Sequence, residues 1–316
     1  MSNHKILTID NLSLQEFDSE SDLIPLLTPE DEEEMNNEIL PETLPILPLR
    51  NTVLFPGVVI PISAGRDKSI KLINDANASG KVIGVVAQIN EADEDPSKND
   101  INKIGTVAKI LRVLKMPDGN VTVILQGKKR FEIDAVTAET PYLKAVIKEV
   151  EEKRPKKNDT EFQAIVDSIR ELAIEIIKES PNIPTEATFA IKNIESQSFL
   201  INFVSSNMNL TVKEKQDLLT INVLKDRAME TLRYMNVELQ KLELKNDIQS
   251  KVRFDLDQQQ REYFLHQQMK TIQEELGGVS YEQEIEEMRQ KAKSKKWDEK
   301  TGKHFEKEVS KLQRMN

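Results

Sequence analysis

The stretch LPILPLRNTVLFPG at residues 44–57, continued by VVIPISAGR at 58–66, decides the fold of the first half of the chain. Its prolines alternate with short runs of Leu, Ile and Val, and each proline fixes φ and removes a backbone donor. Such residues suit the edges and corners of a sheet. The stretch therefore predicts two strands joined by a tight, apolar corner.

Strand signals continue from this corner through residues 44–151, which hold seven of the ten glycines. The segment PDG at 117–119 has turn chemistry and predicts a hairpin. Its strands are expected at 104–116 and 121–126, with further strands at 82–89, 130–136 and 142–150. One helix, at 66–78, has apolar residues at steps of three and four. The pattern predicts a compact, strongly bent β-domain that carries a small helix.

The charged segment EEKRPKKN at 151–158 separates this domain from a helical half. Residues 158–222 predict a helical bundle with Asp159 among its candidate N-caps. Thr211 and Glu214 have the spacing of a capping box, in which hydroxyl and carboxylate satisfy amides of the first turn. Residues 280–316 predict a charged helical segment, started by a second capping box at Ser280 and Gln283.

Between them, residues 223–276 predict one helix of roughly 80 Å at 1.5 Å per residue. Its two apolar stripes, one ending at Leu242 and one starting at Leu265, are rotated by about 140° relative to each other. We therefore expect the near end to pack against the bundle and the far end to contact something else. A continuous two-stranded coiled coil is disfavoured.

The net charge of −10 comes from the N-terminus, because residues 1–43 hold twelve of the 54 acidic side chains and one of the 44 basic ones. This composition predicts a disordered acidic tail at 1–43. It acts as a solvated spacer, an electrostatic guard against anionic ligands or a docking tail. The rest of the chain is close to neutral.

Five segments stand in an order and spacing that closely resemble the N-terminal region of the Lon family of ATP-dependent serine proteases. They are LPILPLRNTVLFPG, IPISAGRDKSI at 60–70, VAQI at 86–89, GTVAKILRVLKMPDGNVTVILQGKKRFEI at 105–133 and QREYFLHQQMKTIQEELG at 260–277. The resemblance implies a PUA-like pseudobarrel at 44–151. The expected fold class is therefore α+β, with this bent β-domain followed by an α-helical bundle and one very long helix.

The resemblance implies a substrate-recognition and assembly region of a protease that degrades misfolded and regulatory proteins. ATP and Mg²⁺ are expected in a separate ATPase domain, and a Ser-Lys peptidase dyad after it. No GxxxxGK[ST] phosphate loop occurs in the sequence, so we expect no catalytic or cofactor-binding residues here. The chain stops about where the ATPase is expected to begin. The expected partners are unfolded or degron-bearing proteins. The expected assembly is a homohexamer, and the expected location is the bacterial cytoplasm.

Two sets of residues are candidates for binding. The corner provides an apolar set that is large for one short turn, and it forms either a groove for unfolded polypeptide or ordinary core: Leu49, Val53, Leu54, Phe55 and Val58. The far end of the long helix provides a set expected to contact neighbouring subunits or the ATPase: Arg261, Tyr263, Phe264, Leu265, Met269, Ile272 and Leu276.

Composition excludes several other classes of protein. The absence of cysteine excludes disulfides and thiolate metal sites, and the histidines at 4, 266 and 304 are too scattered for a metal motif. No apolar run reaches the ~18 residues that cross a bilayer, and we expect neither a signal peptide nor a membrane partner.

Basic clusters at 128–130, 153–157 and 291–296 raise the alternative of a stand-alone PUA-like RNA-binding protein. The neutral body offers no basic stripe, so we interpret these clusters as solvated surface and expect no nucleic-acid partner. A further alternative is a non-catalytic adaptor or holdase. A phosphate loop encoded downstream of Asn316 is the observation that separates these readings.

Overall fold

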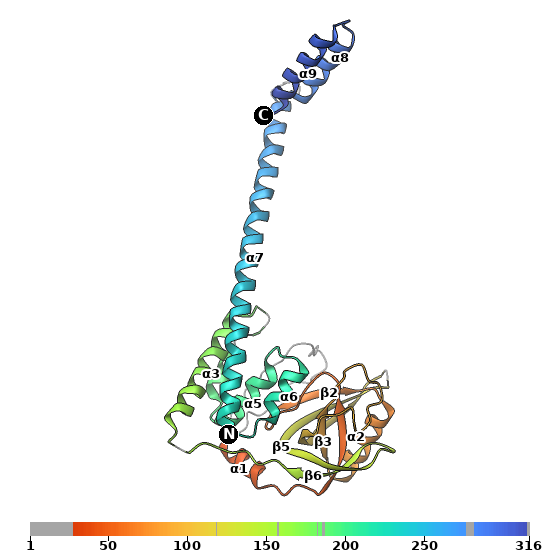
Figure 1. Cartoon of the computed structure of the whole chain (residues 1–316), viewed down its shortest axis with the longest axis vertical. Helices are drawn as coiled ribbons and strands as arrows, with labels where there is room; N and C mark the ends of the chain where they lie inside the picture. The colour runs from red at the N-terminus through yellow and green to blue at the C-terminus, as the bar shows by residue number, and fades with distance from the viewer. Residues whose placement is uncertain are drawn as a thin grey trace. The chain divides into compact units, whose positions relative to one another are not determined.

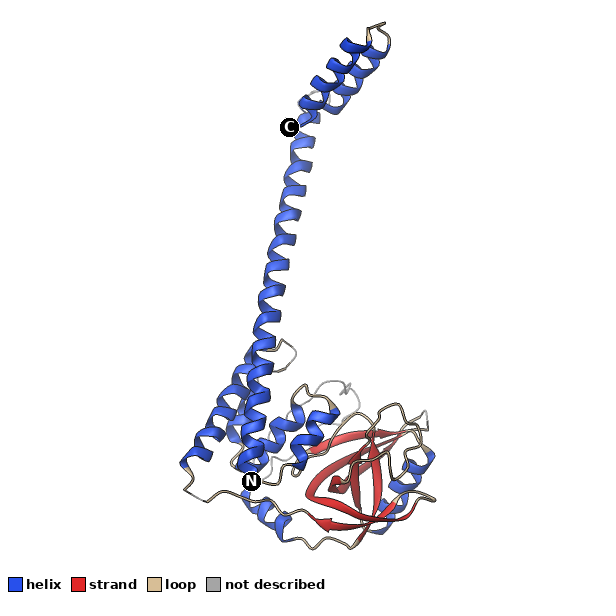
Figure 2. Cartoon of the chain, in the orientation of Figure 1, coloured by secondary structure: helices blue, strands red, loops and turns tan. Residues whose placement is uncertain are grey.

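The computed structural model describes residues 28–117, 119–156, 158–181, 183–184, 187–275 and 281–314. Its contacts divide into two compact units, Met1–Leu244 and Lys245–Asn316. Strands occur in the first unit, and helices occur in both (Figure 2).

A six-stranded sheet forms the β-part of the first unit (Figure 1). Its strands are β1 Thr43–Leu49, β2 Val59–Ala64, β3 Val82–Ala87, β4 Ile104–Lys115, β5 Val121–Ala138 and β6 Lys144–Glu149. The spatial order is β2-β5-β4-β3-β1-β6, and β5 also pairs with β6. This last pairing closes the sheet on itself. Register shifts in the β4–β5 and β5–β6 ladders let the 18-residue β5 bend far enough to reach both partners.

The predicted hairpin is confirmed, because Lys115 on β4 pairs with Val121 on β5. The Met116 amide donates to the Asn120 carbonyl at 2.9 Å, and Gly119 has a φ of 87°, which glycine adopts without strain. Helix α2, Asp67–Ser79, follows β2 and buries Leu72 and Ile73 in the interior of the sheet.

Helices follow the sheet in the order expected from periodicity. They are α3 Thr160–Glu179, α4 Ala187–Asn193, α5 Gln197–Asn207, α6 Val212–Thr220 and α7 Leu224–Glu275. Asp159 caps α3 by accepting from the Phe162 amide, and the capping box of Thr211 and Glu214 is present at α6. Both caps were predicted from the sequence and are confirmed.

One apolar core joins the sheet to the helical bundle across the predicted boundary at 151–158. Val53 and Phe55 from the β-corner belong to the same buried cluster as Phe162, Ile169 and Phe199 from the helices. The two parts of the first unit are therefore packed together rather than tethered. The finer division into separate domains stays a prediction.

Helix α1, Pro29–Asn37, corrects the prediction of a disordered tail for residues 28 onward. Thr28 and Asp31 form a capping box, and Pro29 stands in the first turn, where its missing donor is no loss. Glu32 and Met35 are buried against the rest of the unit. The acidic composition of the tail did not predict that these two side chains are buried. The part of the expectation that concerns residues 1–27 lies outside the described residues.

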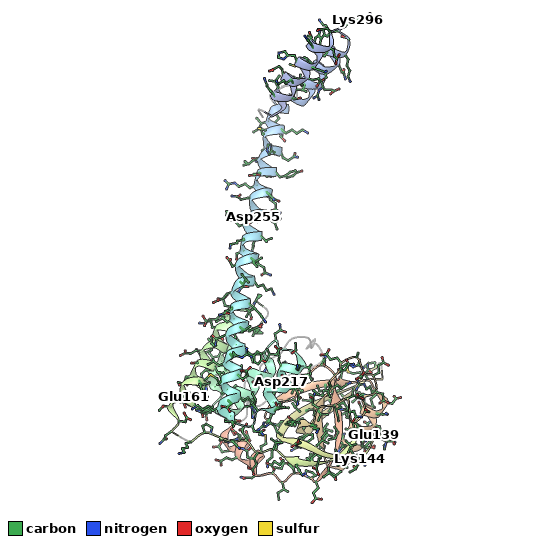
Figure 3. All side chains as sticks on the ribbon, in the orientation of Figure 1. Glu139, Lys144, Glu161, Asp217, Asp255 and Lys296 are labelled. Atoms are coloured by element: carbon green, nitrogen blue, oxygen red, sulfur yellow. The ribbon has the colours of Figure 1, made fainter. Side chains whose placement is uncertain are left out.

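The second unit contains the far part of α7 with α8 Tyr281–Lys293 and α9 Glu299–Arg314. Ile285 and Val309 are buried in it, and the rings of Trp297 and Phe305 meet edge to face at 5.1 Å. Asp255 on α7 and Lys296 before α9 are exposed (Figure 3). The capping box expected at Ser280 lies outside the described residues.

Candidate functional site

The β-corner is core and offers no groove. Its five candidate residues are each at most 3% exposed: Leu49, Val53, Leu54, Phe55 and Val58. The hypothesis that they form an exposed surface for unfolded polypeptide is therefore wrong, and the alternative of ordinary core holds. Phe55 is fully buried.

Contacts from distant strands and helices account for this burial. The Thr106 hydroxyl donates to the Leu54 carbonyl at 2.5 Å, and the Gly57 amide donates to the Gly127 carbonyl at 2.9 Å. A Cβ at Gly127 would lie 2.2 Å from the Phe55 carbonyl oxygen, so only glycine allows β5 to approach the corner this closely. The sheet covers one side of the corner and the helical bundle covers the other.

Charged residues and one amide side chain meet at the junction between the sheet and the bundle, which we call the seam. Its members are Glu32, Arg130, Glu152, Arg154, Asn202 and Arg227. Arg227 on α7 is completely buried, and its guanidinium lies 3.0 Å from Glu152 and donates to Asn202 at 2.8 Å. Burial lowers the pKa of this guanidinium, while Glu152 opposes the shift. A buried cation of this kind is tolerated because it is paired and hydrogen-bonded.

Arg130 on β5 joins the sheet to the end of α6. Its Nη1 donates to the carbonyls of Leu219 and Ile221, both at 2.9 Å. Burial and then the charge of Arg227 lower the pKa of Arg130 to about 10. Its Nη2 finds no hydrogen-bond partner among the described residues. The interpretation of residues 128–130 as a solvated basic cluster is therefore wrong for Arg130, which is buried.

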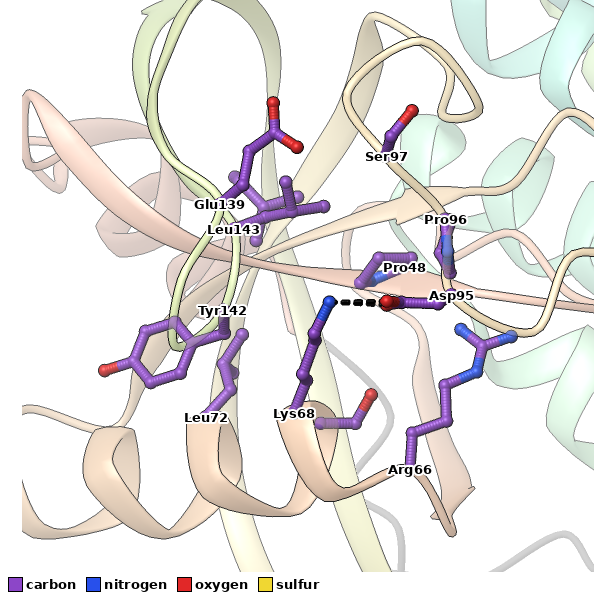
Figure 4. A pocket seen from close by; sticks show the side chains of 12 residues that line it. Pro48, Arg66, Lys68, Leu72, Asp95, Pro96, Ser97, Glu139, Tyr142 and Leu143 are labelled. Carbon is purple, nitrogen blue, oxygen red and sulfur yellow. Dashed lines mark hydrogen bonds and ion pairs between the residues drawn. The ribbon is translucent and has the colours of Figure 1, made fainter.

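A cavity of about 100 Å³ lies between the start of α2 and the loops at 93–97 and 139–143 (Figure 4). Lys68 pairs with Asp95 at 2.6 Å across it, and Arg66 donates to the Gln88 side chain at 2.8 Å. Lys68, Asp95 and Arg66 are thus already engaged by other groups of the protein. The volume is also well below the ~300 Å³ of an ordinary ligand pocket, so the cavity does not serve as a substrate site.

The long helix exposes the second set of candidates. Tyr263, Phe264, Leu265, Met269 and Ile272 are between 50% and 68% exposed, and Arg261 is exposed too. Leu276 lies outside the described residues. Because helical neighbours are three and four residues apart, Leu265, Met269 and Ile272 share one face, whereas Tyr263 and Phe264 point elsewhere.

The same helix exposes apolar residues that are not among the predicted candidates. Ile248, Val252 and Leu256 step by four and are each more than 50% exposed. Their spacing of four residues was present in the sequence and could have predicted an apolar stripe on this part of the helix. Every residue from 247 to 272 is exposed, so no other described residue covers this apolar surface.

The described residues contain no group of three His, Asp or Glu side chains placed to hold a metal ion. None of the helices within the described ranges is both long and apolar enough to span a bilayer.

Known proteins share both the sequence and the fold. A family model described as the ATP-dependent protease La (LON) substrate-binding domain matches residues 43–237. A Lon protease of Flavobacterium johnsoniae is 85% identical over the whole chain, which covers 39% of that protein. One of Cytophaga hutchinsonii is 50% identical over 93% of the chain and 36% of its own length. The chain thus spans less than half the length of these relatives.

A solved structure supports the fold. The N-terminal domain of a Mycobacterium avium complex Lon protease matches with a TM-score of 0.52 at 22% identity, over 61% of this chain and 98% of that one. This likeness concerns the fold alone, and it confirms the predicted α+β class.

Proposed function

The chain belongs to the family of Lon substrate-binding domains, and on that premise we propose that it is the substrate-recognition and assembly region of an ATP-dependent serine protease. The observation that carries the proposal is the family match over 43–237 together with 85% identity to a Lon protease over the full chain. The family predicted from the sequence is confirmed.

The chemistry of the whole enzyme belongs to segments that this chain does not contain. The relatives are two to three times longer than the aligned region, which leaves room for an ATPase domain with ATP and Mg²⁺ and for a peptidase domain with a Ser-Lys dyad. The chain itself contributes protein binding, in a homohexamer of the bacterial cytoplasm.

The exposed face of α7 carries the assembly role. Leu265, Met269 and Ile272 present apolar side chains that the described chain leaves uncovered. Exposed apolar surface of this kind marks sites of protein–protein contact. Arg261, Tyr263 and Phe264 extend the contact around the same helix, toward neighbouring subunits or the ATPase.

Substitution of this face in the full-length protease tests the proposal. We expect the triple variant L265S/M269S/I272S to lower the hexamer fraction in sedimentation and the ATP-dependent degradation of unfolded casein. A matched variant, Q267S/Q268S/K270S, changes exposed polar residues of the same turns and should leave both unchanged.

Salt separates this mechanism from a nucleic-acid one, because apolar association persists at high ionic strength while RNA binding weakens steeply. Unchanged assembly of the apolar triple variant contradicts the role of α7. Salt-sensitive capture of RNA by the chain contradicts the proposed function itself.

A further inference from the structure

Helix α1 lies on the seam, and its contacts indicate that it binds there as a segment that another helix can displace. We propose that α1 occupies in cis a docking groove in the seam, and that this groove takes an acidic helical segment with Glu-x-x-Met spacing from a partner protein when α1 leaves. The proposal goes beyond the proposed function, because it assigns a second protein-binding site outside α7 and outside the β-corner.

Two side chains of α1 are buried in the groove, and Glu38, its C-cap residue, lies 3.7 Å from the Lys128 ammonium. Glu32 and Met35 are three residues apart and therefore share one face of the helix. One carboxylate oxygen of Glu32 accepts from the Arg154 guanidinium at 2.5 Å, and the other accepts from the Ser196 hydroxyl. Met35 is 5% exposed and belongs to the apolar core that contains Phe199. An anionic contact and an apolar contact one helical turn apart thus define what the groove recognises.

The bonds that Ser196 makes show that the groove is built for a carboxylate. Its hydroxyl accepts from the Phe199 amide at 3.1 Å as the N-cap of α5, and it donates to Glu32. The positive end of the α5 dipole and the Arg154 cation therefore act on the same carboxylate.

Charge in the seam favours an acidic occupant. Arg130, Arg154 and Arg227 lie around the carboxylate of Glu152, and Glu32 from α1 adds a second carboxylate. The cavity beside α1 is also lined by Lys128, Lys129 and Glu149. When α1 leaves, three guanidinium groups and two ammonium groups remain with the carboxylates of Glu149 and Glu152, so the surplus of positive charge persists. Partly buried charges of one sign attract a ligand of the opposite sign and disfavour others.

Space beside α1 remains unfilled. A cavity of about 60 Å³ is lined by Met35 and Asn36 of α1 and by Arg130 and Phe199 of the groove. The Nη2 of Arg130, a side chain that is 3% exposed, has no hydrogen-bond partner among the described residues. The groove therefore offers more contacts than α1 uses, so a partner segment can compete with it.

The attachment of α1 is also reversible in principle. A nine-residue helix is marginal alone in water and is ordered mainly by what it packs against. Its other acidic residues, at 30, 31, 33 and 34, are exposed. A short connection to β1 holds α1 at an effective concentration on the order of millimolar, so a free ligand must compete with it.

A labelled peptide of residues 28–38, TPEDEEEMNNE, tests the proposal with the 316-residue chain. Met35→Asp in the chain should release α1, because a carboxylate cannot take the buried position of the thioether. We expect the peptide to bind this variant at least about tenfold more tightly than the unsubstituted chain, as measured by fluorescence anisotropy.

Matched peptides show which contacts matter. Peptides that carry Glu32→Gln or Met35→Asp should bind the released chain about tenfold more weakly, whereas one that carries Glu33→Gln should bind as the parent does. In the chain, Arg154→Gln should weaken binding, while Arg233→Gln, on the exposed surface of α7, should not.

Three results overturn the proposal. The first is equal affinity of the peptide for the released and unsubstituted chains, and the second is an unchanged peptide affinity after Arg154→Gln. The third is a dimer of the unsubstituted chain that Met35→Asp abolishes, because this result assigns the groove to a second copy of the chain. If circular dichroism shows that Met35→Asp unfolds the chain, Met35→Ala gives the same comparison. Loss of hexamers through α7 leaves these outcomes untouched, so the two proposals fail separately.

Discussion

At the scale of the residue, Phe55 shows what burial adds to a sequence pattern. It stands between Leu54 and Pro56 in the apolar corner and packs in the core shared with α3 and α5. Phe55→Ala should lower the free energy of unfolding by about 3 to 5 kcal/mol, because it leaves a cavity in a packed interior. Urea denaturation followed by circular dichroism measures this loss.

The matched control is Phe189→Ala on α4, whose ring is 67% exposed. Its expected cost is under about 0.5 kcal/mol, as for surface substitutions away from special features. Equal effects of the two substitutions contradict the burial of the corner.

Local bonds were predictable at this scale, and long-range burial was not. Asp159, Thr211 and Glu214 reach amides within three residues, so their roles follow from spacing alone. The burial of Phe55 depends on helices that begin more than 100 residues later. The pairing of Glu32 depends in the same way on Arg154 and Ser196. No local periodicity encodes those partners.

At the scale of the element, caps link the helices to pH. The Thr211 amide and hydroxyl, which donate to Glu214, lower the pKa of this carboxyl below its ordinary value of 4.5. A carboxyl with a lowered folded-state pKa stabilises the fold above its unfolded pKa, and this stabilisation is lost as pH falls through the folded value.

Glu214→Gln separates charge from shape, because glutamine can also accept from the Thr211 amide in a capping box. We expect the unfolding midpoint of the variant to lie below that of the parent at neutral pH, and the difference to shrink as pH falls through the lowered folded-state pKa of Glu214. Thermal unfolding at a series of pH values measures it. Glu171→Gln, on the exposed surface of α3, is the control, and a difference that does not change with pH contradicts the role of the charge.

Elements differed in how well the sequence predicted them. The β4–β5 hairpin and α7 were readable, because turn residues and long periodicity are properties of one segment. Helix α1 was missed, because an acidic composition favours disorder unless a docking surface is known. Its capping box at Thr28 and Asp31 was present in the sequence and was the available signal.

At the scale of the whole molecule, the α+β class and the order of strands before helices followed from the sequence. The sequence did not predict that the sheet and the bundle share one core. A charged segment such as 151–158 has the same composition whether it separates two domains or crosses a packed junction. The two compact units divide inside α7, at residues 244 and 245, and the division of the first unit at 151–158 stays a prediction.

The two units should unfold in separate steps. The first unit has an extensive buried core, whereas Ile285 and Val309 are the buried apolar residues described in the second. Stability rises with the apolar area removed from water, so the second unit should unfold at the lower urea concentration.

The fluorescence of Trp297 reports the unfolding of the second unit, because Trp297 is the single tryptophan of the chain and packs on Phe305 in that unit. We expect its fluorescence to change at a lower urea concentration than the main transition in circular dichroism. Phe305→Ala should shift the fluorescence transition alone, and Phe55→Ala should shift the main circular dichroism transition alone. Coincident transitions that both substitutions move together would mean that the chain unfolds as one cooperative unit, and that the contacts within α7 couple the two units.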